Sequence, residues 1–523
     1  MNNSQEEKLC NLIKANVKLI QIVSYETMRF HAMLINVSKE LDRDFYIWNR
    51  VDGIKKWNED GRKFESEGTG DGPDSAIEFF KEDENENMIL LLEDFYPDFT
   101  EDKPGMIRNL RNIAAESSHN KTLIFSQPFL QLPKELEKDV HVLELPYPDV
   151  EDLKAIYKRV CNTYEIQNSE EPDHELIEAA LGLTIMEAEK AFSLAFIENG
   201  KLTGAEVPLV IREKENVIKK SGYLEYYHPK ETMDDVGGLQ NLKEWLKKRG
   251  RGFDKHAKDF GLTCPKGILL LGIPGTGKSL TAKAVGNLWH FPLLRLDMGK
   301  IFGGIVGESE KNIREALKIA EAISPSILWI DEIEKGMSGI SSSGSTDGGT
   351  TARVLGTFLT WMQEKTKPVF VVATANDISQ LPPELLRKGR VDEIFFVDLP
   401  TAKEREEIVK IHLKRKNRGP EKFNIKKIAE ESKGFSGAEL EEAIKEALFQ
   451  AYDDEVEIED EHILRAINKT YPLSRTMHDT IEKMRQWAKS RAVSASAEQC
   501  EILEIKDKDA PKLKQETYNN PFI

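Results

Sequence analysis

Short apolar runs alternate with longer amphipathic stretches along most of the chain. The longest runs, such as 88–92 and 268–271, fall far short of the roughly 20 apolar residues that cross a bilayer, so we expect buried strands and no membrane span. Between 369 and 413 the pattern predicts a β-branched strand, a loop, a short helix, a second strand and an amphipathic helix. This segment therefore predicts an α/β unit.

A similar order of elements occurs in the first half of the chain. Three sequence blocks match in the same order: ILLLED (89–94) with ILWIDE (327–332), QLPKEL (131–136) with QLPPEL (380–385), and GLTIMEAEKAF (182–192) with GFSGAELEEAI (434–444). Chance similarity would not keep this order, so we favour a tandem duplication of an α/β unit. The alternative is two unrelated α/β domains with similar turn sequences.

Composition excludes several classes of protein. A chain of 523 residues, 40% hydrophobic and 31% charged, is typical of a soluble protein of roughly two to four domains. The net charge of −17 disfavours nucleic acid as the main partner. The beginning of the chain, MNNSQEEKLCNLIK, lacks the basic and apolar regions of a signal peptide, which predicts an intracellular protein. No zinc-ligand or redox spacing relates the cysteines, Cys10, Cys161, Cys264 and Cys500.

The clearest chemical motif is GILLLGIPGTGKSLTAKAVGNL (267–288), in which an apolar strand leads into a helix-forming run. That context is the one a GxxxxGKS phosphate loop requires. Backbone N–H groups would surround the β-phosphate, Lys278 would reach the β and γ oxygens, and Ser279 would ligate Mg²⁺. The alternative is a glycine-rich turn without a ligand. The predicted nucleotide-binding residues here are Gly272, Pro274, Gly275, Thr276, Gly277, Lys278, Ser279 and Leu280.

Three later segments supply the other groups that ATP hydrolysis needs. SILWIDE (326–332) ends a strand with Asp331, for Mg²⁺, and Glu332, to polarise the attacking water. ATAN (373–376) ends the next strand with Asn376, which could orient that water. LLRKGRVD (385–392) offers Arg387 and Arg390 to the γ-phosphate bound by a neighbouring subunit. Each of these groups alone is more often an ordinary surface or turn residue, and the phosphate loop upstream favours the functional interpretation.

Seven motifs in order carry a resemblance to a known family: DDVGGL (234–239), GIPGTGKS (272–279), GESEKNIREAL (307–317), ILWIDE, ATAN, LLRKGRVD and GFSGAEL (434–440). Over roughly 231–470 the chain resembles the classical AAA branch of the AAA+ ATPases. The resemblance implies a parallel-sheet domain with a helical lid, in an assembly that is usually hexameric. It also implies adenine contacts at Asp235, Val236, Gly237, His412, Gly437 and Ala438. The whole chain, with its divergent first half and SGYLEYY at 221–227, resembles an AAA group of cyanobacteria and plastids.

Two features depart from the family pattern. Members that thread polypeptides carry an aromatic-hydrophobic-glycine loop before GES, whereas this chain has Ile305-Val306-Gly307, with Phe302 upstream. In the first half, SYETMRFHAML (24–34) stands where a phosphate loop would follow the strand, and the arginine pair is missing after QLPKEL. We therefore predict one ATP site per chain and a degenerate AAA-like first half used for assembly or partner recognition.

These observations predict the following organisation: a degenerate AAA-like α/β domain over 1–199, a connecting helix over 200–230, an ATPase large subdomain over 231–400, a helical lid over 401–490 and a polar tail over 491–523. The first functional hypothesis is ATP- and Mg²⁺-dependent remodelling of a protein partner by a homo-oligomer, with a hexamer favoured. The second is a nucleotide-gated binding module with slow hydrolysis. A nucleic-acid motor is disfavoured by the net charge. We expect the protein in the cytoplasm, or in the plastid stroma if it is encoded there.

Overall fold

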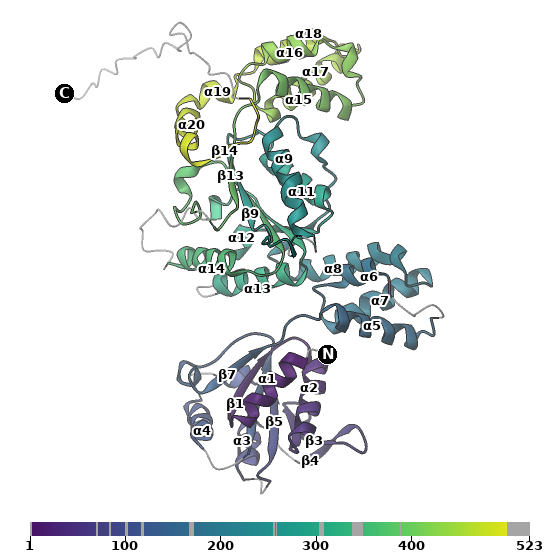
Figure 1. The fold of residues 1–523 in the computed structure, drawn as a ribbon, viewed down its shortest axis with the longest axis vertical. Coiled ribbons are helices and arrows are strands. Elements are labelled where there is room, and N and C mark those ends of the chain that lie inside the picture. Colours follow the sequence, from purple (N-terminus) through teal and green to yellow (C-terminus); the bar gives the residue numbers. More distant parts are fainter. Residues whose placement is uncertain are drawn as a thin grey trace, which may run out of the picture. The chain divides into compact units, whose positions relative to one another are not determined.

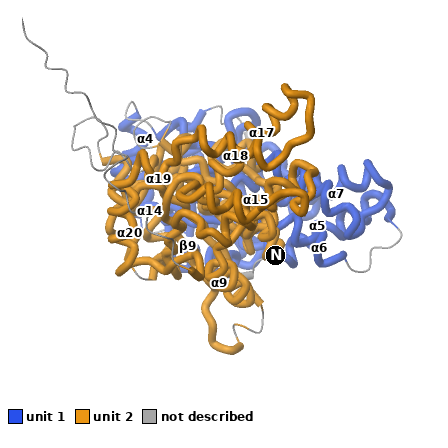
Figure 2. The backbone as a smooth tube through the Cα atoms, turned by 90° about the horizontal axis from the view of Figure 1, so that it is seen from above, with its two compact units in different colours: residues 1–217 blue, residues 218–523 orange. Residues whose placement is uncertain are grey.

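The chain forms two compact units, residues 1–217 and 218–523 (Figures 1 and 2). The boundary falls within helix α8 (Val207–Ser221). The computed structural model describes residues 3–68, 72–82, 85–99, 103–116, 120–166, 172–254, 257, 259–302, 308–336, 349–387 and 389–498. The predicted pore residues Ile305, Val306 and Gly307 and the tail from 499 onward lie outside these ranges.

Unit 1 begins with helix α1 (Asn3–Lys14) and contains a seven-stranded sheet in the order β4-β3-β2-β5-β6-β1-β7. Its strands are β1 (Leu19–Val23), β2 (Asp44–Asn49), β3 (Gly53–Asn58), β4 (Lys63–Gly68), β5 (Met88–Glu93), β6 (Thr122–Gln127) and β7 (Val140–Glu144). The connecting helices are α2 (Thr27–Glu40), α3 (Pro73–Glu82), η1 (Tyr96–Asp98), α4 (Pro104–Ala115) and η2 (Lys134–Leu136). Strand β3 pairs antiparallel with both β2 and β4 at one edge, and the other pairings are parallel.

The sheet of unit 1 has a hydrophobic core on each face. Leu19 belongs to one core, whereas its neighbour Ile20 belongs to the other, because successive residues of a strand point to opposite faces. A separate helical bundle follows, with Tyr157 and Phe192 in its own core. Its elements are α5 (Val150–Thr163), α6 (His174–Ala180), α7 (Ile185–Asn199), η3 (Gly204–Glu206) and α8.

Unit 2 contains a second seven-stranded sheet, in the order β14-β13-β9-β12-β11-β10-β8. Its strands are β8 (Leu224–Tyr227), β9 (Gly267–Gly272), β10 (Leu293–Leu296), β11 (Ser326–Ile330), β12 (Val369–Ala375), β13 (Glu393–Val397) and β14 (Val493–Ser494). The elements between them include η4 (Met233–Asp235), α9 (Gln240–Gly250), η5 (Arg251–Phe253), α11 (Lys278–Trp289), α12 (Met298–Ile301), α13 (Glu308–Ala322), α14 (Thr350–Glu364) and η7 (Ile378–Gln380).

The C-terminal helices of unit 2 are α15 (Ala402–Arg415), η8 (Pro420–Lys422), α16 (Ile425–Glu431), α17 (Gly437–Asp453), α18 (Asp460–Lys469), α19 (Leu473–Thr476) and α20 (His478–Arg491). Helices α15 to α18 form the lid. Val409, Leu440 and Ile463 belong to a core of their own, separate from the two cores of the sheet. The predicted α/β fold, a parallel sheet with a helical lid preceded by a related α/β domain, is confirmed.

The parallel strands of the two sheets follow the same order. This order is β2-β5-β6-β1-β7 in unit 1 and β10-β11-β12-β9-β13 in unit 2. The matched blocks ILLLED and ILWIDE contain the equivalent strands β5 and β11. The shared order is what a duplicated α/β unit would produce.

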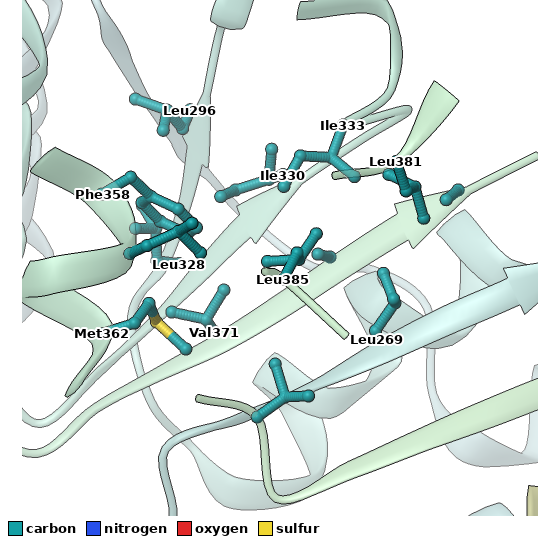
Figure 3. Close-up of a cluster of buried hydrophobic side chains, with 14 of the residues drawn as sticks. Leu269, Leu296, Leu328, Ile330, Ile333, Phe358, Met362, Val371, Leu381 and Leu385 are labelled. Atoms are coloured by element: carbon teal, nitrogen blue, oxygen red, sulfur yellow. The ribbon is translucent and has the colours of Figure 1, made fainter. Parts of the chain in front are cut away.

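The leucines of the repeated hexapeptides lie in the cores. Leu136 is fully buried in unit 1. Leu381 and Leu385 are buried in unit 2 against side chains of the central strands, among them Ile330 and Val371 (Figure 3). The similarity between QLPKEL and QLPPEL therefore follows from a shared packing requirement, and it carries no information about nucleotide chemistry.

The linker between the halves differs from the sequence prediction. The helix expected over 200–230 ends at Ser221, and residues 224–227 form β8, which pairs antiparallel with β10. Gly222 has a φ of 79°, a left-handed conformation that terminates helices and that glycine adopts without steric cost. The buried Leu224 then joins the sheet core.

Two predictions about the C-terminal part also need correction. The expected polar tail from 491 begins with packed residues, since Ala495 is fully buried and its N–H donates to the carbonyl of Phe396 over 3.0 Å. Helix α20, expected within the lid, packs against the sheet core instead, because its apolar stripe faces that core. The stripe consists of Ile481, Met484 and Ala488.

Candidate nucleotide-binding site

The predicted phosphate loop joins strand β9 to helix α11. Gly275 and Gly277 have φ angles of 77° and 92°, which are left-handed values that side chains disfavour. A Cβ atom on Gly272 would lie 2.0 Å from the carbonyl oxygen of Val397, so only glycine fits there. The loop leads directly into the N-terminus of α11. The unpaired backbone N–H groups at a helix N-terminus favour the binding of anions.

Lys278 is the buried cation of this loop. Its side chain is 5% exposed, and Nζ donates to the carbonyl oxygens of Gly272 (2.9 Å) and Ile273 (2.7 Å). Burial lowers the pKa of Lys278 to about 8, against the opposing effect of nearby Glu334, Asp331 and Glu332. The ammonium group therefore lies folded against its own loop, where a bound phosphate would compensate its charge.

Ser279 and Asp331, predicted to bind Mg²⁺, lie together. Ser279 Oγ donates to Asp331 Oδ1 over 2.7 Å, and Thr374 Oγ1 donates to the same oxygen over 2.7 Å. Hydroxyl and carboxylate oxygens are the ligands that Mg²⁺ prefers, so these residues fit the ion. Sequence reasoning missed Thr374, although its position two residues before Asn376 placed it on the same face of the strand.

Glu332 and Asn376, which end adjacent strands, are also in contact. Asn376 Nδ2 donates to Glu332 Oε1 over 3.0 Å, and the N–H of Glu332 donates to Thr374 Oγ1 over 3.0 Å. The other carboxylate oxygen of Glu332 pairs with Lys335. Glu332 has a φ of 48°, a left-handed conformation that is uncommon for a residue with a side chain and that turns the chain sharply after β11.

The lid lies directly on the phosphate loop. The N–H of Ala438, in the first turn of α17, donates to the carbonyl of Gly275 over 3.0 Å, and a Cβ on Gly437 would lie 3.3 Å from the same oxygen. A Cβ on Gly237 would lie 2.5 Å from Cγ1 of Ile408 in α15. The absence of a side chain at 437 therefore lets the lid approach the phosphate loop closely, and its absence at 237 lets the segment before α9 approach the lid.

The other residues expected near adenine lie in the 235–236 segment and on α15. Asp235 Oδ1 pairs with Arg415 Nη2 of α15 over 3.0 Å. His412, also on α15, is half-buried, and burial lowers its pKa despite the opposing charge of Glu441. Val236 is buried in the sheet core.

Three other residues expected to contact nucleotide, in the loop and the first turn of α11, help to shape the loop and its packing. Leu280 packs against the sheet core, and Pro274 forms part of the turn. Thr276 Oγ1 donates to the carbonyl of Ile273 over 2.7 Å, which tightens the loop.

Arg387 and Arg390 follow the short helix after β12. Arg387 is exposed, and Arg390 Nη1 donates to the carbonyl of Glu384 over 2.8 Å. Within the part of the chain that the structure describes, neither guanidinium bonds to Asp331 or Glu332. The structure thus brings together the predicted loop, acids and Asn376, and leaves both arginines apart from them.

Comparison with known proteins decides the family. The AAA description "ATPase family associated with various cellular activities" matches residues 268–399, and the AAA+ lid domain matches 422–465. The AAA domain-containing protein ycf46 of Pyropia yezoensis is 40% identical over 503 residues, which cover 95% of this chain and 100% of that protein. The chain belongs to this AAA family.

Further matches cover both halves of this AAA protein. The ycf46 protein of Guillardia theta is 39% identical over 482 residues, covering 91% of this chain and 93% of that protein. The cell division cycle protein 48 homolog of Archaeoglobus fulgidus is 34% identical over 256 residues, covering 48% of this chain and 34% of that protein. These findings confirm the resemblance inferred from the motifs. Among the described residues, no helix is both long and apolar enough to cross a membrane.

The first half matches specific AAA domains. The SpoVK-like AAA ATPase N-terminal domain matches residues 5–145, and the second domain of the same group matches 151–221. Asp94, which aligns with Glu332, has a nearly equal φ of 49°. The preceding Glu93 accepts from Asn49 over 3.2 Å and bonds to His31 Nε2 over 2.7 Å. The turn after the strand therefore has the same backbone conformation in both units. In unit 1, however, His31 bonds to Glu93, whereas in unit 2 Ser279 and Thr374 bond to the aligned Asp331.

The loop after β1 differs most from the AAA pattern. Only residues 24–26 separate β1 from α2. Glu26 is 7% exposed, pairs with Arg29 over 2.7 Å, and accepts from the N–H of Ile185 over 2.6 Å. Arg29 also pairs with Asp152 over 3.4 Å. Side chains of unit 1 therefore occupy the position where unit 2 has its glycine-rich loop.

Proposed function

We propose that this AAA chain binds ATP with Mg²⁺ and hydrolyses the β-γ phosphoanhydride bond at the site between β9, β11 and β12. The single observation that carries the proposal is the contact of Asp331 with Ser279 on one side and of Glu332 with Asn376 on the other. A glycine-rich turn without a ligand would not need two carboxylates held beside it by these contacts. Loop N–H groups and Lys278 would hold the phosphates.

The residues have distinct roles in this proposal. Ser279 and Asp331 would hold Mg²⁺, which neutralises charge on the phosphate oxygens when bound. Glu332 would accept a proton from the attacking water, and Asn376 would orient the carboxylate and the water. Because Lys335 pairs with Glu332, that ion pair must open or shift for Glu332 to act as a base. Adenine would lie between the 235–237 segment and the lid, near His412, Gly437 and Ala438.

We also propose that catalysis requires assembly. Arg387 is exposed and Arg390 bonds only to a nearby carbonyl among the contacts described, so both are available to the γ-phosphate of a neighbouring copy. The homo-oligomer, for which a hexamer is favoured by family resemblance, would couple hydrolysis to remodelling of a protein partner. Unit 1 would serve assembly or recognition of that partner, in the cytoplasm or in the plastid stroma.

The second candidate is a nucleotide-gated binding module. The contacts of Glu332 favour it, because both carboxylate oxygens already have partners, Asn376 and Lys335. In that case ATP and ADP would switch the lid, and hydrolysis would be a slow timer.

The test is ATP turnover per protomer as a function of protein concentration, with Glu332→Gln as the blank. The proposal expects turnover to rise with concentration until assembly is complete and the blank to be inactive. A low rate that is independent of concentration would favour the second candidate. A partner that raises turnover and is itself altered would identify remodelling.

A further inference from the structure

Glu334 is a buried acid that the roles above do not include. It lies in the turn after β11, and its side chain is 4% exposed. Oε1 accepts from the backbone N–H of Asn376 over 2.9 Å, whereas Oε2 has no hydrogen-bond partner among the described residues. Burial raises the pKa of Glu334. A buried carboxylate with one unpartnered oxygen costs stability relative to an apolar side chain, so packing alone does not explain it.

The contacts of Glu334 lead directly to the reacting groups. The backbone of Asn376 is held by Glu334, and the side chain of Asn376 holds Glu332 Oε1 over 3.0 Å. The N–H of Ile333 donates to the carbonyl of Thr374 over 3.0 Å. The turn of residues 331–334 is thereby tied to the end of β12 through backbone and side-chain bonds.

We propose that Glu334 is a positioning residue for ATP hydrolysis, which holds the end of β12 so that Asn376 keeps Glu332 in its reactive orientation. This inference rests on the proposed function of the site. It assigns Glu334 no contact with nucleotide or water. Its effect should therefore appear in kcat and should pass through Asn376.

A different role is open to the same carboxylate. Glu334 is close enough to Lys278 to favour its charged form, so it could act only as a counter-charge for that lysine. Glu334→Gln separates the two roles, because the amide oxygen can still accept the bond from Asn376 but the charge is lost. Glu334→Ala removes both.

The experiment measures kcat and KM for ATP in the assembled full chain with Mg²⁺. We expect Glu334→Ala to lower kcat by about tenfold to a hundredfold, because losing the positioning removes part of what a well-placed general base contributes to the rate. KM should stay within about threefold of wild type. Glu334→Gln should stay within about threefold of wild type in both constants. The matched control is Glu206→Ala in unit 1, because Glu206 is likewise 4% exposed and accepts a backbone N–H over 2.8 Å; its turnover should not change.

A double-mutant cycle makes the test specific. In an Asn376→Ala background, Glu334→Ala should lower kcat by less than about twofold, because no side chain remains to be positioned. Additive losses, or equal losses in the Gln and Ala variants, would overturn the inference. Turnover of the wild type above the Glu332→Gln blank tests the proposed function separately. If there is no such turnover, both the proposed ATP hydrolysis and the positioning role of Glu334 are refuted. If the wild type does turn over ATP but Glu334→Ala is unaffected, only the positioning role is refuted.

Discussion

The backbone N–H of Ile185 donates a hydrogen bond of 2.6 Å to Oε1 of Glu26. Ile185 begins α7, and Glu26 immediately precedes α2. In unit 2 Ile185 aligns with Gly437, and the N–H of the next residue, Ala438, donates to the carbonyl of Gly275 over 3.0 Å. In each unit the first turn of a helix outside the sheet, α7 of the bundle or α17 of the lid, thus contacts the loop after β1 or β9. In unit 1 a side-chain carboxylate accepts the bond, whereas in unit 2 a backbone carbonyl accepts it.

We predict that Glu26 keeps the helical bundle of unit 1 closed on its sheet. Glu26→Ala removes a charged acceptor, a loss of about 1.5–3 kcal/mol in local stability. Amide hydrogen exchange in the first turn of α7 should then accelerate by about tenfold or more. The control is Glu189→Ala in the same helix, because Glu189 forms an exposed ion pair with Arg159. Equal exchange in both variants would show that Glu26 does not hold the helix.

We predict one nucleotide per chain, bound in unit 2. Lys278→Ala should abolish binding of a fluorescent ADP analogue, measured by titration to saturation, because the side chains of Glu26 and Arg29 replace the phosphate loop in unit 1. Lys318→Ala, at an exposed position of α13, serves as the control and should bind normally. Saturable binding by Lys278→Ala would place a second site in unit 1 and contradict the prediction.

We predict that Arg387 completes the site of a neighbouring copy. Arg387→Ala should lower kcat by about a thousandfold or more and leave nucleotide affinity within about threefold. Mixing this variant with Lys278→Ala should restore part of the activity, since one chain then supplies the intact site and the other the arginine. Repeating the mixing experiment with Arg390→Ala in place of Arg387→Ala shows which of the two arginines completes the neighbouring site. Mixtures no more active than their components would argue against a shared site.

We predict that nucleotide binding takes up protons above pH 8. The pKa of Lys278 is lowered from 10.5 to about 8 by burial, and a bound phosphate raises it again. Between pH 8 and 10.5 the unfolded chain binds the additional proton, so this group makes unfolding less favourable as the pH rises through that window. The affinity for ADP, in contrast, should fall with rising pH, by up to about tenfold per pH unit.

Calorimetry in two buffers of different ionisation enthalpy measures that uptake. We expect a fraction of a proton per nucleotide at pH 8.5 and almost none at pH 6.5. Lys365→Arg is the matched control, because burial also lowers the pKa of Lys365 to about 8 but its ammonium bonds to the carbonyl of Lys266 outside the site. Uptake that disappears in this control would mean that Lys365, not Lys278, is the titrating group.

Local patterns were sufficient to predict much of this molecule. Gly272 through Ser279 could be placed between a strand and a helix because glycine spacing and apolar runs are properties of neighbouring residues. Thr374 and Glu334 were missed, since each resembles an ordinary polar residue near a strand end. The strand β8 was also missed, because its pairing partner lies about 70 residues further along the chain and strand pairing is non-local.

The α/β class, the phosphate loop and the loss of that loop in the first half could all be predicted from the chain, because these depend on residue type and short spacing. Which side chains meet could be learned only from the three-dimensional fold. Ser279 and Asp331 are separated by 52 residues, Asn376 and Glu334 by 42, and Ile185 and Glu26 by 159. Hydrogen bonds form only at about 3 Å, and the strand order and the packing of the lid set such distances.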